Sequence, residues 1–357
     1  MMTAICRRSR EGWEERQNIS PPSEVYILEH SQPGKPGMEA GNMLMQERID
    51  TLTEQLHDPT RSSAALMDLL AMGKDSVAAL VDLLHLTRPS SLPEARLLAV
   101  EGLSILKGPV ALAALIVVAT QDLAEIADPA VRLAEETVAS RAALALADFS
   151  EPDAYDALLE LLDEKPFIGV AEAFGKLRDA RAIPHLTSWL EEDFVAEAAS
   201  RALLAFGSSA IPTLLASLQQ KHPRYGDESG MSRRRRARIL GILAELAPLE
   251  SLDGLEGLLD ESDEGIRGKA VELFLEKGKP VQRRRTFRAA IELLQSSDGF
   301  LRADLERLLL SHFDLGSDAI EEEIGRRRLN REVEEFWPRE NALAILLRIQ
   351  RKARGTG

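Results

Sequence analysis

The sequence predicts an all-α fold, arranged as an α-solenoid of about eight helical hairpins. A helix–turn–helix frame recurs along the chain, most clearly over residues 145–158, 173–186 and 242–255. One supersecondary unit that recurs at a spacing of tens of residues is the signature of a repeat array. Aromatic residues make up only 4% of the composition. That scarcity favours closely packed helices over strands, which prefer aromatic and β-branched residues.

The first 42 residues differ from the rest of the chain. They contain Pro21-Pro22, Pro33-Gly34 and Pro36-Gly37 and show no helical period. Such a composition cannot bury a core, so we expect residues 1–42 to form a disordered N-terminal tail. A docking tail for another protein is the alternative interpretation.

The repeat array is predicted over residues 43–316. Apolar residues from Met45 to Leu56 recur at i, i+4, i+7 and i+11, which places them on one face of an amphipathic helix. Further along, Gly207 is expected to end a helix and Pro212 to occupy the first turn of the next, because each residue is favoured at that place. The turns are thus specified by local chemistry.

Two irregular segments and a C-terminal region complete the organisation. Residues 128–147 predict an unusually long second helix, and residues 219–232 form a polar insertion between the two helices of one hairpin. Such an insertion can map to the binding side of an array, but we expect a tolerated surface loop, since long loops cost little stability. After Phe313 the frame is lost, and residues 317–357 are predicted to be C-terminal capping helices.

The turn Ala-Leu-x-x-Leu-x-x-Pro-x-Ala-x-x-x-Leu and the Asp-x-x-x-Arg approach to it resemble HEAT repeats. They are most similar to the phycobilisome-lyase-type HEAT-like repeat family, over about residues 43–316. In HEAT families the Asp and Arg side chains make ladders between successive repeats. The resemblance implies that structural inter-repeat role for Asp128, Arg132, Asp263, Arg267, Asp298 and Arg302. Phe167 and Ala196 stand where Arg would be expected, so the ladder is interrupted in the middle.

Charge and cysteine usage restrict the class of protein. The net charge is −14, from 58 acidic and 44 basic residues. An acidic chain is poorly suited to coat nucleic acid or an anionic membrane. The single cysteine, Cys6, cannot form an intramolecular disulfide, which fits a reducing compartment. We therefore expect a cytoplasmic protein with no membrane association.

Nothing in the sequence predicts a catalytic, metal or cofactor site. The six histidines are scattered and no pair has the spacing of metal ligands. The sequence lacks a phosphate-binding loop, a nucleophile elbow and a dinucleotide fingerprint. We expect no enzyme active site; if the chain were an enzyme, the resemblance would imply a phycobilin lyase-like activity.

Two arginine runs, at residues 233–238 and 283–288, lie at the starts of predicted helices. Arginine there opposes the helix dipole, which favours an outside role such as a patch for phosphate or an acidic peptide. Alternatively, one arginine in each run is structural and the others are solvated. Both interpretations stay open. The candidate partner-binding residues are Arg233, Arg234, Arg236, Arg283, Arg284 and Arg288.

These observations favour a non-enzymatic protein-binding scaffold or adaptor. Its partner, another protein or a peptide, would lie on a concave surface formed by the second helices of successive hairpins. The resemblance also implies an alternative, a bilin-lyase-like chaperone or lyase for a chromophore, which would need a pocket with aromatic walls. A nucleic-acid-binding HEAT protein is a third reading, and the acidic net charge counts against it. The scaffold reading requires no cofactor.

Overall fold

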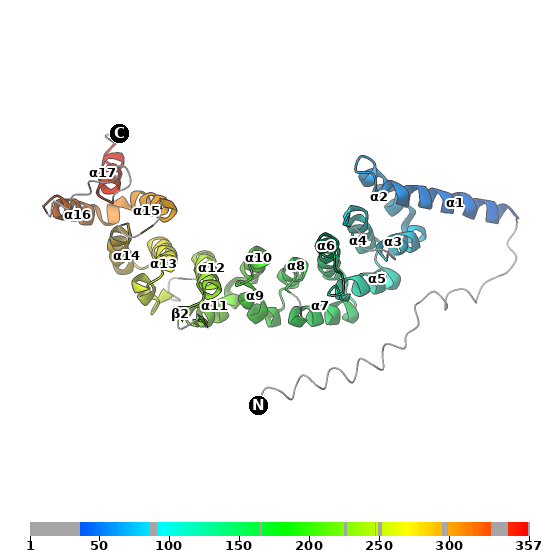
Figure 1. Cartoon of the computed structure of the whole chain (residues 1–357), viewed down its shortest axis with the longest axis horizontal. Helices are drawn as coiled ribbons and strands as arrows, with labels where there is room; N and C mark the ends of the chain where they lie inside the picture. Colours follow the sequence, from blue (N-terminus) through cyan, green and yellow to red (C-terminus); the bar gives the residue numbers. More distant parts are fainter. Residues whose placement is uncertain are drawn as a thin grey trace, which may run out of the picture. The chain divides into compact units, whose positions relative to one another are not determined.

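The computed structural model describes residues 36–85, 91–164, 166–224, 227–246, 248, 252–294, 297, 299–329 and 342–355. The chain forms two compact units, residues 1–69 and 70–357. Figure 1 shows the helices of each unit in chain order.

The predicted all-α class is confirmed. Among the described residues, the strands are two residues long each and form one antiparallel ribbon, β1 (Pro223–Arg224) with β2 (Asp227–Glu228). The α-helices are α1 (Pro36–Gln55), α2 (Ser62–Met72), α3 (Val77–Leu84), α4 (Glu94–Leu106), α5 (Pro109–Thr120), α6 (Pro129–Leu146), α7 (Pro152–Glu164), α8 (Ile168–Leu177), α9 (Ile183–Trp189), α10 (Ala196–Phe206), α11 (Ile211–Leu218), α12 (Gly230–Leu246), α13 (Glu264–Lys277), α14 (Pro280–Leu293), α15 (Gly299–Ser311), α16 (Ser317–Leu329) and α17 (Ala342–Ala353). Short 3₁₀ segments are η2 (Gly73–Ser76), η3 (Ala180–Ala182), η4 (Gly207–Ala210), η6 (Glu256–Asp260) and η7 (Phe313–Leu315).

The first unit contains α1 and most of α2. Helix α1 begins at Pro36, so the predicted start of the helical region at Met43 is wrong by seven residues. Proline fits the first turn of a helix, where its missing N–H has no partner to lose. The apolar period predicted for this helix and the turn after it is confirmed, because Ile49 and Leu56 are buried. Residues 1–35 of the predicted tail lie outside the described residues.

In the second unit one row of helices makes successive contacts. This row consists of α4, α6, α8, α10, α12, α13 and α15, and each member contacts the next. We call these the second-row helices. Each also packs against the helix that precedes it in its own hairpin, from α3 with α4 to α14 with α15. Figure 1 shows α6, α8, α10 and α12 following one another in this order. The contacts are therefore sequential, as a repeat array requires.

The predicted long second helix is α6, and its start is set by a capping residue. The carboxylate of Asp128 accepts hydrogen bonds from the backbone N–H groups of Ala130 (2.8 Å) and Val131 (3.4 Å). These bonds satisfy donors that have no partner within the helix. Helix α6 then runs unbroken to Leu146.

Helices α6 and α8 approach each other closely because a glycine lies between their backbones. A Cβ atom on Gly169 would lie 1.7 Å from the carbonyl oxygen of Ser140, so no larger residue fits without moving a helix. The Gly169 N–H also donates to Ser140 Oγ (2.8 Å). On the other side of α8, a Cβ atom on Gly175 would lie 3.0 Å from the Cα atom of Ala202 in α10. Small residues thus set the spacing of three second-row helices.

Residues 196–218 are the one described stretch long and apolar enough to cross a membrane. The chain divides this stretch into α10, η4 and α11, and Gly207 adopts a positive φ of 62° at the break. Pro212 lies in the first turn of α11, as predicted. Leu203 of α10 and Leu214 of α11 are fully buried, which is the behaviour of helices in the core of a folded protein.

Candidate functional site

A groove of about 660 Å³, lined largely by apolar side chains, lies on the second-row helices α6 and α8. The loop before α6 and the turn before α10 complete its walls. We call it the apolar groove. Its apolar lining includes Leu123, Leu133, Leu144, Phe167, Ile168 and Phe194.

Three large apolar side chains of the groove lie open to solvent. Leu133 is 65% exposed, Ile168 is 44% exposed and Phe194 is 60% exposed. They come from near the start of α6, the start of α8 and the turn before α10, so each successive repeat contributes one. Single exposed apolar residues are ordinary, but a group of them lining one cavity marks an interaction site.

Charged side chains surround this apolar floor. The acidic ones are Asp122, Glu136, Glu164 and Glu172, and the basic ones are Arg132 and Arg141. Glu172 is already paired with Arg201 of α10 at 3.0 Å.

The chain around the groove is acidic well beyond its rim. Residues 109–206 contain 7 basic and 18 acidic residues, a net charge of −11 out of −14 for the whole chain. This section includes every helix from α5 to α10. The groove is therefore placed in the most acidic part of the sequence.

Two of the six residues of the predicted ladder act as helix caps. Asp128 caps α6, and Asp263 caps α13 by accepting a hydrogen bond from the N–H of Ile266 (2.9 Å). Asp263 also lies 3.7 Å from the guanidinium group of Arg233 in α12. Arg267 pairs within its own helix, with Glu264 at 3.9 Å. The remaining ladder residues are Arg132 in the groove, Arg302 on α15 and Asp298, which lies outside the described residues.

Other polar pairs link the second-row helices. Besides Arg201 and Glu172, Arg238 of α12 donates to the carbonyl of Leu190 (2.6 Å) and to Asp193 (2.8 Å) in the turn before α10. The interruption of the repeat motif at Phe167 has a structural counterpart, because Phe167 lines the apolar groove. The apolar Phe167 in place of the ladder arginine is the sequence signal for the groove. The residue pattern alone did not show that this departure belongs to a cavity.

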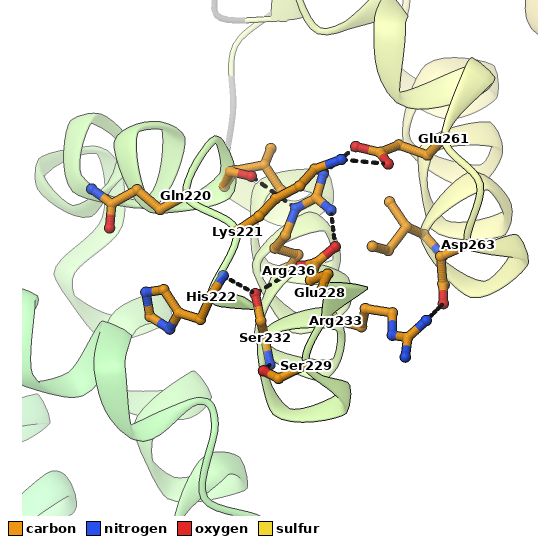
Figure 2. Close-up of polar contacts among 12 residues, drawn as sticks. Gln220, Lys221, His222, Glu228, Ser229, Ser232, Arg233, Arg236, Glu261 and Asp263 are labelled. Carbon is orange, nitrogen blue, oxygen red and sulfur yellow. Dashed lines mark hydrogen bonds and ion pairs between the residues drawn. The ribbon is translucent and has the colours of Figure 1, made fainter. Parts of the chain in front are cut away.

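The first arginine run is partly internal. Arg236 is only 1% exposed, so it cannot belong to an exposed partner-binding patch, and that assignment is wrong. Its guanidinium group donates to Glu228 (2.8 Å) and Glu261 (2.5 Å), and its Nε donates to the Leu218 carbonyl (2.9 Å). Figure 2 shows Arg236 between these two carboxylates.

Arg235 is also buried, at 2% exposure. It donates to Glu191 (2.8 Å) and to the carbonyl of Gln220 (2.5 Å). Burial lowers the pKa of Arg235 from its ordinary value, against the opposing effect of Glu191 and Glu228. We call Arg235, Arg236 and their carboxylate partners the arginine clasp.

The insertion at residues 219–232 is part of this clasp, so its prediction as a merely tolerated surface loop is wrong. The β1–β2 ribbon brings Glu228 to Arg236, and Ser232 Oγ donates to the same carboxylate (2.7 Å). Lys221 reaches Glu261 across α12 at 2.9 Å (Figure 2). Partial burial acts to raise the pKa of Glu261, but the hydrogen bonds from Arg236 and Lys221 outweigh it and hold the pKa below its ordinary value.

Arg233 and Arg234, the other two candidate partner-binding residues of this run, reach the surface. Arg233 faces Asp263 (Figure 2), and Arg234 lies 3.2 Å from Asp193. Both therefore have an acidic partner within the chain.

The second arginine run lines a polar cavity of about 710 Å³. Arg284 and Arg288 are exposed in it, while Arg283 donates to the Leu275 carbonyl (2.7 Å) and contacts His312 (3.2 Å). The cavity also contains the acidic residues Asp260, Glu292, Asp314 and Asp318. These four carboxylates outnumber the three lining arginines, Arg284, Arg285 and Arg288, so the lining carries no net positive charge.

Comparison with known proteins adds no family assignment. A scan against protein-family models finds no match, and a search of the curated proteins finds no relative. Among the described residues, no group of three or more His, Cys, Asp or Glu side chains is arranged to hold a metal ion.

Proposed function

We propose that the chain is a non-enzymatic protein-binding scaffold built on HEAT-like repeats, which holds a protein or peptide partner against its second-row helices. The observation that carries this proposal is the apolar groove with its three exposed side chains, Leu133, Ile168 and Phe194. Peptide recognition on helical repeats uses such a row of apolar anchors along successive helices.

The energetics support a partner that covers the groove. Complete burial of one large apolar side chain contributes about 1.5–3 kcal/mol. Association itself costs about 4–15 kcal/mol in lost freedom of motion. Three apolar anchors alone would therefore give weak binding, and the charged rim must contribute to a stable complex.

The rim also argues against the other two readings. A nucleic acid and a tetrapyrrole with its carboxylate side chains are both anionic, and both would meet the acidic residues Asp122, Glu136 and Glu164. Like charges placed together oppose binding. A protein partner can instead present groups of the opposite sign.

Affinity capture with matched variants tests this function. The groove variant carries Leu133→Gln and Phe194→Gln, and the control carries Val117→Gln on α5, where Val117 is 56% exposed outside the groove. We expect a partner that the wild type and the control retain and the groove variant loses, both in extract and with the purified partner. Equal retention by all three proteins would refute a protein-binding role for the groove, as would recovery of a chromophore or nucleic acid as the only ligand.

A further inference from the structure

We infer that the partner segment in the apolar groove is basic and amphipathic, with two or three large apolar side chains flanked by Lys or Arg. This inference rests on the proposed function and names the chemistry of its partner. The segment would be a helix whose apolar face enters the groove and whose basic residues meet the rim.

The first argument is the charge of the site. Glu136 and Glu164 of the rim make no ion pair with any residue in the described part of the chain. Arg132 and Arg141 lie on the same rim, but three acidic residues, Asp122, Glu136 and Glu164, remain once Glu172 is paired with Arg201, and they outnumber these two. Complementary charge therefore requires an excess of basic residues in the partner.

The second argument is the charge of the surrounding chain. The net charge of −11 over residues 109–206 surrounds the groove. A field of one sign raises the local concentration of an oppositely charged partner and speeds its association. An acidic partner would be repelled before it reached the apolar floor.

The third argument is an internal example of the same recognition. Helix α17 is a basic amphipathic helix that packs against α15 and α16. Its apolar residues Ile345, Leu346 and Ile349 are buried. Its basic residues Arg348 and Lys352 donate to Glu306 of α15 at 2.8 and 3.1 Å. A second-row helix of this chain thus already binds a helix of the proposed kind.

The contact between α17 and α15 also shows how a carboxylate responds to basic neighbours. Partial burial acts to raise the pKa of Glu306, but the hydrogen bonds from Arg348 and Lys352 outweigh it and lower the pKa below its ordinary value. The carboxylate therefore stays ionised beside the basic helix. Glu136 and Glu164 offer the groove the same kind of acceptor.

Two synthetic peptides test the inference with the full-length protein. Both are 18 residues long, carry a fluorophore and have Leu at i, i+3, i+4 and i+7 spacing. The polar positions are Lys in one peptide and Glu in the other. By fluorescence polarisation at low salt, we expect the Lys peptide to bind at least about tenfold more tightly than the Glu peptide, because charge complementarity discriminates between partners.

Matched variants locate the binding. The substitutions Leu133→Gln with Phe194→Gln remove apolar anchors, and Glu136→Gln with Glu164→Gln remove rim charge. Each pair should weaken binding of the Lys peptide by about tenfold or more. The charge-matched control, Asp156→Asn with Glu160→Gln, changes two exposed acids of α7 outside the groove and should leave binding unchanged within about twofold.

The outcomes separate this inference from the proposed function. Equal binding of both peptides would overturn the charge preference. Binding of the Lys peptide that is unaffected by the groove variants would also overturn it, because the peptide would then follow the general acidity of the chain. If neither peptide binds while a captured protein still requires the groove, the inference fails and the proposed function survives.

Discussion

Between α5 and α10 the chain has 18 acidic and 7 basic residues, and the groove in this section leaves Glu136 and Glu164 without an ion pair among the described residues. The arginine clasp on α12 buries Arg235 and Arg236 and pairs both with carboxylates. The carboxylates of Glu136 and Glu164 remain available to another molecule. In the second region charge is used to connect neighbouring helices and the loops between them.

The difference explains why arginine-rich sequence and binding surface do not coincide here. A buried arginine must be paired, because an unpaired buried charge is strongly unfavourable. The arginines of the clasp are therefore paired within the chain and are not available to another molecule. Glu136 and Glu164 of the groove have no such partner among the described residues. Stability measurements on the two regions can test this contrast.

The largest expected effect is the loss of a clasp arginine. Arg236→Met leaves Glu228 and Glu261 without their shared partner in a buried setting. We expect the free energy of unfolding to fall by about 3–5 kcal/mol. Urea denaturation followed by circular dichroism measures it.

Arg284→Met is the matched control, since Arg284 is exposed. It should change stability by no more than about 0.5 kcal/mol. If the two variants were equally stable, the clasp would not be a structural element, and the contrast between the two regions would fail.

A smaller loss is expected at the close approach of α6 and α8. Gly169→Ala would place a Cβ atom 1.7 Å from the Ser140 carbonyl oxygen, and the helices must separate to admit it. We expect the variant to lose about 1–3 kcal/mol of stability and to distort the groove.

The control for that prediction is Gly241→Ala in α12, where a new Cβ atom would meet nothing within 4 Å. Alanine favours helix over glycine by about 1 kcal/mol, so this variant should gain stability. Thermal melting curves of both variants should move in opposite directions. If both melting temperatures moved in the same direction, the close contact between residue 169 and the Ser140 carbonyl would not limit the side chain at that position.

A pH effect is expected at the second arginine run. Burial, followed by the nearby Arg283, lowers the pKa of His312 below 6.5. The unfolded chain therefore binds a proton more readily than the fold does. The neutral form of His312 is therefore the form that the fold favours. Its contribution to the free energy of unfolding is complete above pH 6.5 and is lost as the pH falls through the lowered pKa.

Urea midpoints at pH 7.5 and pH 5.5 measure this effect. The wild type should lose stability on acidification, and His312→Gln should lose less. An equal loss in both proteins would show that His312 is not the titrating group.

The smallest expected effect on stability is at the groove. Leu133→Gln and Phe194→Gln change side chains that are 65% and 60% exposed, and each should cost no more than about 0.5 kcal/mol. The same substitutions should abolish partner binding. A large loss of stability would assign these residues to the fold rather than to a binding surface.

The sequence predicted local structure well where local chemistry decides it. The long helix α6, the helix end at Gly207 and the first-turn position of Pro212 all follow from capping and backbone preferences. Apolar period also identified the buried face that includes Ile49 and Leu56. These features depend on residues that are near each other in the sequence.

The site was harder to predict because its parts come from different repeats. Arg236 and Glu261 are 25 residues apart, and Arg235 and Glu191 are 44 residues apart. No periodic pattern indicates such pairs, so the sequence left the arginine run open between a surface patch and a structural role. Leu133 and Phe194 are also distant in the sequence, and each alone resembles an ordinary core residue.

The insertion at residues 219–232, which contains the β1–β2 ribbon, has a consequence for synthesis of the chain. Arg236 follows Glu228 by 8 residues but precedes Glu261 by 25 residues. At about 5–20 residues per second on the ribosome, Glu261 emerges about 1–5 s after Arg236. During that interval Glu228 has already been synthesised and Glu261 has not. The insertion therefore supplies the first of the two carboxylates that pair with Arg236. Glu228→Gln should therefore reduce the soluble yield from translation more than the yield from refolding of the complete chain.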